Sequence, residues 1–225
     1  MIACQLERAR GLYYYRRMNH RSTPRVPLAL RLALLTLASA LLAGCLSTET
    51  TITLDRDGGG TLELSYEIDR VAWETGVFDK SDLARAIPVT EHEFAAAAQQ
   101  IAGLRLRSHR TESDEQTVLI SARLDFDSPD SLARFLGAES VELTMDGRSG
   151  RWRQIIAPGG GSTDEGAREL AASFEGYALR FVLDPPEPVR STNGTVVRAA
   201  DAAEFSVSLS EIMTATEPLV WEVAW

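Results

Sequence analysis

The stretch Thr51-Ile-Thr-Leu-Asp-Arg-Asp-Gly-Gly-Gly-Thr-Leu-Glu-Leu64 places a glycine-rich turn between two segments in which apolar and polar residues alternate. A period of two on both sides of turn residues predicts a β-hairpin. The alternating acids of this turn also resemble the start of a calcium loop. The twelfth position of such a loop needs a bidentate acid but here holds Tyr66, so a hairpin turn is the favoured interpretation.

Helix signals follow the hairpin. Thr90 and Glu93 have the spacing of a capping box, and Gly103 stands where the helix should end. Ser128-Pro129-Asp130 predicts a second, short helix, since Pro suits the first helical position. A third helix is expected from about Asp164 to Phe174.

Alternating apolar residues predict further strands, at 104–110, 118–126, 141–145, 152–156, 177–183, 205–209 and 219–225. Residues 71–86 read as a broken helix or loop, with Trp73 and Phe78 as anchors, and Asn193-Gly194 as a turn. The order of elements favours an α+β fold, a mainly antiparallel sheet with about three helices packed on one face, in a single domain.

A different kind of signal precedes the hairpin. Leu42, Ala43, Gly44 and Cys45 end an apolar run of roughly a dozen residues behind the arginines of residues 21–31. A basic front, a short apolar run and small residues at the cut are the parts of a secretory signal, which is too short to span a bilayer permanently. The segment before Met18 fits such a signal poorly, so translation is expected to start at Met18.

The same four residues resemble the lipobox of bacterial lipoproteins. This resemblance implies cleavage before Cys45, a diacylglycerol group on its sulfur, and a fatty acid such as palmitate on the new terminus. Two or more acyl chains anchor a protein stably, because each buried methylene contributes about 0.8 kcal/mol. We therefore expect a lipoprotein signal peptide at 1–44, a lipidated tether at 45–50 and the exported domain at 51–225.

Charge and cysteine content limit the partners. The chain has 23 basic and 32 acidic residues, of which residues 1–44 hold seven basic and one acidic. Residues 45–225 therefore have a net charge of −15. Such a surface repels nucleic acid and anionic headgroups, so membrane attachment is expected to come from the lipid. Beyond Cys45 there is no cysteine, and therefore no disulfide or thiolate metal site.

No catalytic motif stands out, so we expect a protein that is not an enzyme and has no cofactor or metal. His92 and His109 are assigned to the solvated surface. Gly159-Gly160-Gly161 precedes a helix but lacks the lysine of a phosphate-binding loop, so it is interpreted as a linker.

Two groups of residues are candidates for contact with a ligand or partner. Arg151 and Arg153 flank Trp152, and Trp221 and Trp225 share one face of the last strand. The alternatives are an exposed strand face that balances local acids, for the arginines, and core packing, for the terminal tryptophans.

The export signal with Cys45, the hairpin 51–64 and the late stretch Phe181-Val-Leu-Asp-Pro-Pro-Glu-Pro-Val-Arg-Ser-Thr-Asn-Gly-Thr-Val196 together resemble the LppM-type family of bacterial lipoproteins. Members often carry a C-terminal membrane helix, which is not expected here. The resemblance implies a compact α+β domain of unknown function at the cell envelope, one that handles lipid-like ligands, and it supplies no catalytic residue.

The expected function is therefore that of a lipid-anchored, non-enzymatic binding module for a hydrophobic or lipid-like ligand or an envelope protein. A structural scaffold in an envelope assembly complex is the alternative. Leu46 stands where an Asp would imply retention in the inner membrane. An outer-membrane location is expected in a host with two membranes, and the outer face of the cell membrane otherwise.

Overall fold

The computed structural model describes residues 46–75, 88–172, 174, 176–197 and 201–225. Strands β1 (Leu46–Leu54) and β2 (Gly60–Asp69) form the predicted hairpin, with Ile52 opposite Leu62. The other elements are α2 (Arg70–Glu74), α5 (Glu91–Gln100), β3 (Leu104–Ser113), β4 (Thr117–Phe126), α6 (Pro129–Leu136), β5 (Val141–Asp146), β6 (Ser149–Ala157), α7 (Glu165–Ala172), β7 (Ala178–Asp184), β8 (Ser191–Thr192), β9 (Thr195–Val197), β10 (Ala202–Ser208), α8 (Leu209–Thr214) and β11 (Leu219–Ala224).

The strands form two sheets. A large sheet has the order β3-β4-β2-β1-β7-β10-β9, and a small sheet has the order β5-β6-β11-β8. Every described pairing is antiparallel except that of β1 with β7. The predicted α+β class and mainly antiparallel pairing are thus confirmed, whereas the single sheet that we expected is divided in two.

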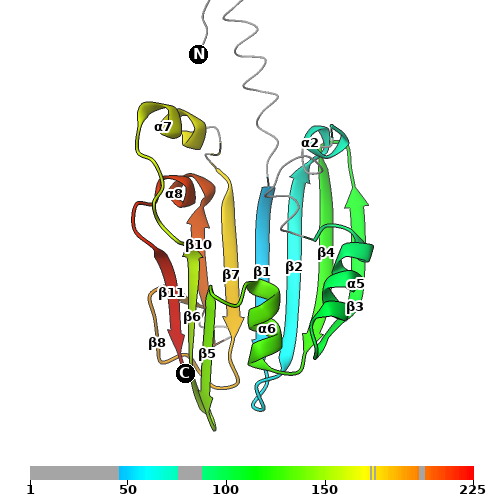
Figure 1. The fold of residues 1–225 in the computed structure, drawn as a ribbon, viewed down its shortest axis with the longest axis vertical. Helices are drawn as coiled ribbons and strands as arrows, with labels where there is room; N and C mark the ends of the chain where they lie inside the picture. Colours follow the sequence, from blue (N-terminus) through cyan, green and yellow to red (C-terminus); the bar gives the residue numbers. More distant parts are fainter. Residues whose placement is uncertain (1–45, 76–87, 173, 175, 198–200) are drawn as a thin grey trace, which may run out of the picture. The chain divides into compact units, whose positions relative to one another are not determined.

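The large sheet has one apolar face and one polar face. Ile52, Leu62 and Leu124 are opposite one another on β1, β2 and β4, and all are fully buried on what we call the inner face. Helix α5 lies in front of β3, the small sheet lies in front of β7 and β10, and α6 lies between them, in contact with both β5 and β4 (Figure 1). Helices therefore cover only part of the face on which we predicted them.

The first strand begins earlier than the sequence analysis expected. Residues 46–50, interpreted as a tether, pair with β2 from Leu46 opposite Ile68 onward, and from Thr48 they also pair with β7. The tether prediction is wrong for these residues, because pairing with β2 holds all five of them in a strand and pairing with β7 also holds the last three. β1 is thus the central strand of the seven, and it starts at the residue that follows Cys45.

Capping residues define the helices as predicted. Thr90 accepts a hydrogen bond from the amide of Glu93 at the start of α5, and Ser128 caps α6 in front of Pro129. Helix α8 was not predicted, although Ser208 and Glu211 form the same capping box. Helix α2 lies in the stretch expected to be a broken helix or loop, whose anchor Phe78 lies outside the described residues.

The buried cluster of apolar side chains found in the described residues is built entirely from residues between Ile52 and Trp225. A chain that begins at Leu46 therefore keeps this core and all the strand pairings given above, and it is expected to fold by itself. No helix of the described residues is both long enough and apolar enough to cross a membrane.

Gly60 tests the hairpin. A Cβ at this position would lie 2.0 Å from the carbonyl oxygen of Thr53 on the paired strand, so Gly60→Ala must push β1 and β2 apart. We expect a loss of at least about 3 kcal/mol in the free energy of unfolding, measured with denaturant. As a control, Gly147→Ala meets no atom within 4 Å and has only the backbone cost of its φ of 61°, about 1–2 kcal/mol. Equal losses in the two variants would contradict this account of the turn.

Candidate functional site

The three candidate tryptophans lie in the core, and Trp221 joins the two sheets. Trp152 and Trp221 are 0 % exposed and Trp225 is 1 % exposed. The ring of Trp221 stacks on Phe205 of the large sheet at 6.1 Å between centroids and lies 6.4 Å from Trp152. None of the three indole Nε1 groups has a hydrogen-bond partner in the described residues. Core packing, the alternative considered for the terminal pair, is where the structure places all three.

Arg151 and Arg153 point away from Trp152, because successive side chains of β6 face opposite sides of the small sheet. Arg153 pairs with Glu222 at 3.5 Å, and Arg151 is exposed. The predicted contact residues are thus separated into a buried aromatic group and an exposed basic group, and they do not make one surface.

The two candidate histidines lie on α5 and β3, which pack against each other. His109 is half-buried, donates from Nε2 to the carbonyl oxygen of Val89 at 3.1 Å, and lies 5.6 Å from the ring of Phe94. His92 is exposed in the first turn of α5. His109 therefore ties the segment before α5 to β3, and its described contacts include no nucleophile. Within the described residues, no group of three or more His, Cys, Asp or Glu side chains is placed to hold a metal ion.

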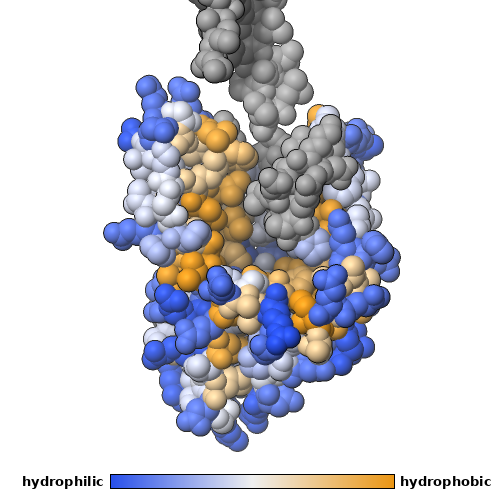
Figure 2. All heavy atoms as spheres, viewed as in Figure 1, coloured by the Kyte–Doolittle hydropathy of each residue, from blue (hydrophilic) through white to orange (hydrophobic). Residues whose placement is uncertain are grey.

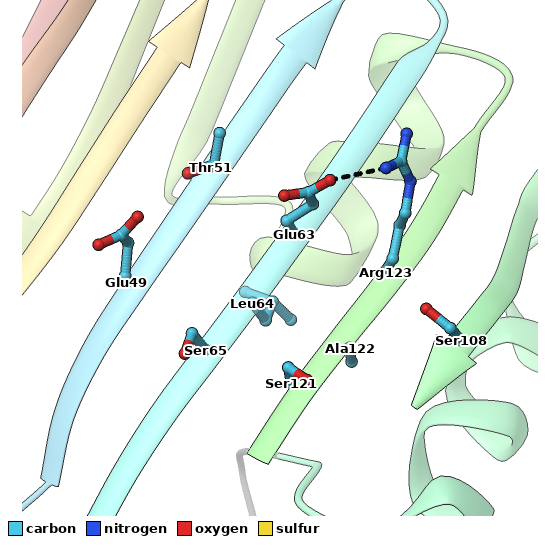
Figure 3. Close-up of a pocket in the computed structure, with 9 residues that line it drawn as sticks. All are labelled: Glu49, Thr51, Glu63, Leu64, Ser65, Ser108, Ser121, Ala122 and Arg123. Carbon is cyan, nitrogen blue, oxygen red and sulfur yellow. Dashed lines mark hydrogen bonds and ion pairs between the residues drawn. The ribbon is translucent and has the colours of Figure 1, made fainter. Parts of the chain in front are cut away.

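A shallow pocket lies on the outer, polar face of the large sheet (Figure 3). Its side chains come from neighbouring strands and are mainly hydroxyls and charged groups, among them Thr51, Ser65, Ser121, Glu63 and Arg123. Arg123 and Glu63 form an ion pair of 2.9 Å across this pocket.

A second ion-pair group borders the same face. Arg180 of β7 pairs with Glu49 at 2.7 Å and with Glu204 at 2.8 Å, and its hydrogen bond lowers the pKa of Glu204. Exposed pairs of this kind contribute about 0–1 kcal/mol each. Because these charges already neutralise one another, we interpret the outer face as a solvated surface.

The inner face carries three hydroxyl side chains near the start of β1. Thr48 and Thr50 of β1 and Tyr66 of β2 are 9, 6 and 5 % exposed, and Thr48 lies directly opposite Tyr66. Their hydroxyls make no hydrogen bond with any described residue. Burial raises the pKa of Tyr66, so this phenol stays protonated. Three hydroxyl groups, each able to donate and accept, therefore sit together on an otherwise apolar face.

Apolar walls border these hydroxyls. On the adjacent strand β7, Leu179 is level with Thr48 and Phe181 with Thr50, and Phe205 of β10 lies opposite Phe181. Leu179 and Phe205 are only partly buried. Figure 2 shows apolar surface on both sides of a hollow in the middle of this side of the molecule, over β7 and β10 on one side and over α5 and α6 on the other.

The sequence analysis missed this group, because it assigned Thr48 and Thr50 to a tether. One signal was present: both threonines continue the period of two that begins with Ile52 and Leu54. The pairing that brings Tyr66 and Leu179 to the same place is a tertiary feature. The predicted lipobox residues Leu42, Ala43, Gly44 and Cys45 lie outside the described residues, as does Met18.

Comparison with known proteins gives one structural likeness. No protein-family model matches the chain, and no curated protein matches it. Among solved structures, the chain is similar to the NMR structure of the folded domain of the LppM protein of Mycobacterium tuberculosis, with 13% identity and a TM-score of 0.46 over 80% of this chain and 90% of that one. At this level of similarity, the functional argument rests on the residues of this chain alone.

Stability measurements can test whether Trp221 is a core residue and Arg151 a surface residue. We expect Trp221→Ala to lower the free energy of unfolding by about 3–5 kcal/mol, because it leaves a cavity between the sheets. Arg151→Ala should change it by less than about 0.5 kcal/mol. Denaturant unfolding of both variants checks this, and a Trp221→Ala protein as stable as the parent would mean that this ring does not hold the sheets together.

Proposed function

We propose that this protein is a lipid-anchored lipoprotein of the bacterial cell envelope whose domain binds a hydrophobic or lipid-like ligand without catalysing a reaction. Lipid on Cys45 would hold it to the membrane, and the inner face of the large sheet would hold the ligand. In a host with two membranes we place it on the outer membrane, because Leu46 follows the lipidated position.

The observation that carries the ligand proposal is the group of three hydroxyls of Thr48, Thr50 and Tyr66 on a face that is otherwise apolar. These hydroxyl oxygens are in no hydrogen bond with a described residue and are not among the fully buried atoms that lack a partner, so each can bond to a group that lies against this face. The surrounding surface is apolar. A ligand with a polar group and a hydrocarbon part, as in a lipid, matches both features.

The walls of the hollow suit a hydrocarbon chain. Leu179 and Phe205 are partly exposed on the inner face, and each would lose water contact when an apolar chain lay against it. Burial of apolar surface contributes about 25 cal/mol per Å², which is the main source of affinity for such a ligand. The outer face offers no comparable surface, since ion pairs such as Arg123–Glu63 cover it.

The anchor has a direct test. When the chain is produced in a bacterial host, the mature protein should begin at Cys45 and carry the mass of a diacylglyceryl group and a fatty acid. Cys45→Ser should not acquire these groups and should not anchor through them. Intact-mass measurement and membrane fractionation check both outcomes. Precursors of equal mass with and without globomycin, or a Cys45→Ser protein that binds vesicles as firmly as the parent, would contradict the anchor.

The ligand site is tested with purified residues 46–225 and a fluorescent fatty acid, cis-parinaric acid. Leu179→Gln should weaken binding by roughly tenfold, because burial of one leucine contributes about 1.5–3 kcal/mol. Val182→Gln is the matched control, since Val182 is also partly buried but points to the opposite face of β7.

Solvent extraction of the same protein, followed by mass spectrometry, should recover apolar material. If Leu179→Gln and Val182→Gln bind the fatty acid equally well, the ligand does not lie on the inner face. A domain that contains no apolar material, binds no fatty acid and co-purifies with envelope proteins would favour the structural scaffold instead.

A further inference from the structure

Large apolar side chains gather at one end of the large sheet. Among the described residues, four such side chains are strongly exposed: Val71 at 51 %, Leu119 at 39 %, Leu170 at 53 % and Val196 at 41 %. Scattered exposed apolar residues are ordinary on a protein surface, but the location of these four is not random. Three of them lie at the end where β1 begins, which we call the Leu46 end.

The strand register places Val71 and Leu119 there. Leu46 lies opposite Ile68 of β2, and Ile68 lies opposite Val118 of β4, so Leu119 is one residue from the level of Leu46. Val71 follows β2 directly in helix α2, and a hydrogen bond of 2.8 Å from the amide of Arg70 to the carbonyl of Gln116 fixes the start of that helix to the β3–β4 turn.

Leu170 reaches the same end from the other side of β1. Leu179 of β7 is level with Thr48, so the first residue of β7, Ala178, is level with Ser47. Ala178 lies opposite Ser208, the residue at which α8 begins, and α8 packs against α7, which carries Leu170. Figure 1 shows α2, α7 and α8 at the end of the sheet where β1 starts.

Val196 lies elsewhere. It is opposite Ala203 of β10, which is opposite Leu183 of β7, and Leu183 is level with Ile52. Val196 is thus six residues along the sheet from the Leu46 level. It serves as a control residue, because it is similarly exposed but lies away from the Leu46 end.

The position of Cys45 indicates that the Leu46 end faces a lipid bilayer. Cys45 is joined to Leu46 by one peptide bond, so their Cα atoms are about 3.8 Å apart, and Leu46 is already held in β1. A lipid on Cys45 would therefore be attached directly next to the sheet, with no flexible linker between the sheet and the bilayer. We propose that the Leu46 end is a bilayer-contact surface, with Val71 and Leu170 inserted among the lipid headgroups; this inference rests on the proposed anchor at Cys45.

Charge at this end selects the kind of bilayer. Acidic side chains outnumber basic ones in the surrounding turn and helices, where the acids are Glu74, Asp114, Glu115, Asp164, Glu165, Glu169 and Glu211 and the bases are Arg70 and Arg168. An acidic surface is repelled by anionic lipid, so the contact suits a zwitterionic bilayer and depends on apolar insertion.

Arg168 gives the surface one polar contact. It lines a pocket of about 640 Å³ between α7 and α8, together with the hydroxyl residues Thr163, Ser208, Ser210 and Thr214. Arg168 has no ion-pair partner among the described residues. A guanidinium beside several hydroxyls at a membrane surface is suited to a lipid phosphate.

Single cysteines test the surface, because residues 46–225 contain none of their own. Val71→Cys, Leu170→Cys and the control Val196→Cys are each spin-labelled in the full lipidated protein, reconstituted in phosphatidylcholine vesicles. The accessibility of each label to a water-soluble nickel complex is compared with that in lipid-free residues 46–225. Labels at 71 and 170 should lose most of their accessibility on vesicles, and the label at 196 should keep it.

Three controls make the outcome decisive. Thermal unfolding checks that each labelled variant folds as the parent does. Intact mass of the same samples reports the lipid on Cys45, so a missing lipid, which would overturn the anchor and the surface with it, is distinguished from a missing contact. If Cys45 carries lipid and the labels at 71 and 170 stay as accessible as the label at 196, the bilayer-contact surface is wrong.

Discussion

The pairing of β1 on both of its edges is the constraint on which the rest of the structure depends. β1 binds β2 in antiparallel register and β7 in parallel register, so it joins the N-terminal hairpin to strands that come more than a hundred residues later. Antiparallel neighbours can follow one another through a tight turn, but a parallel neighbour needs a long connection. Everything between β2 and β7 is that connection, and it supplies β3, β4, the covering helices and half of the small sheet.

Strand alternation then divides the chemistry between two faces. On β1 the residues Glu49 and Thr51 face outward, and Thr48, Thr50 and Ile52 face inward. On the outer face, charged side chains form ion pairs such as Glu49–Arg180 and Arg123–Glu63. The inner face is covered by two different layers, helices and the small sheet (Figure 1). The three hydroxyls belong to β1 and β2, the strands between β4 and β7.

The same strand relates the proposed ligand site to the proposed anchor. Thr48 is two residues from Leu46, so the hydroxyl group begins about 7 Å along β1 from the residue that follows Cys45. A lipid-like ligand that enters from the bilayer would therefore reach Tyr66 and Thr48 before any deeper part of the inner face. Trp221, stacked on Phe205, closes the far side of this region by holding the small sheet against β7 and β10.

The sequence by itself determined the local features: the hairpin at 51–64, the caps of α5 and α6, and most strands of the α+β fold, because capping and alternation depend on residues close together in the chain. It also gave the expectation of a lipid on Cys45, which remains a prediction. Only the tertiary structure decided that residues 46–50 are a central strand, that the strands divide into two sheets and that the three tryptophans are core. Those outcomes depend on which distant strand a segment pairs with. Backbone hydrogen bonds are alike in every strand, so the choice comes from the packing of side chains that lie far apart in the sequence.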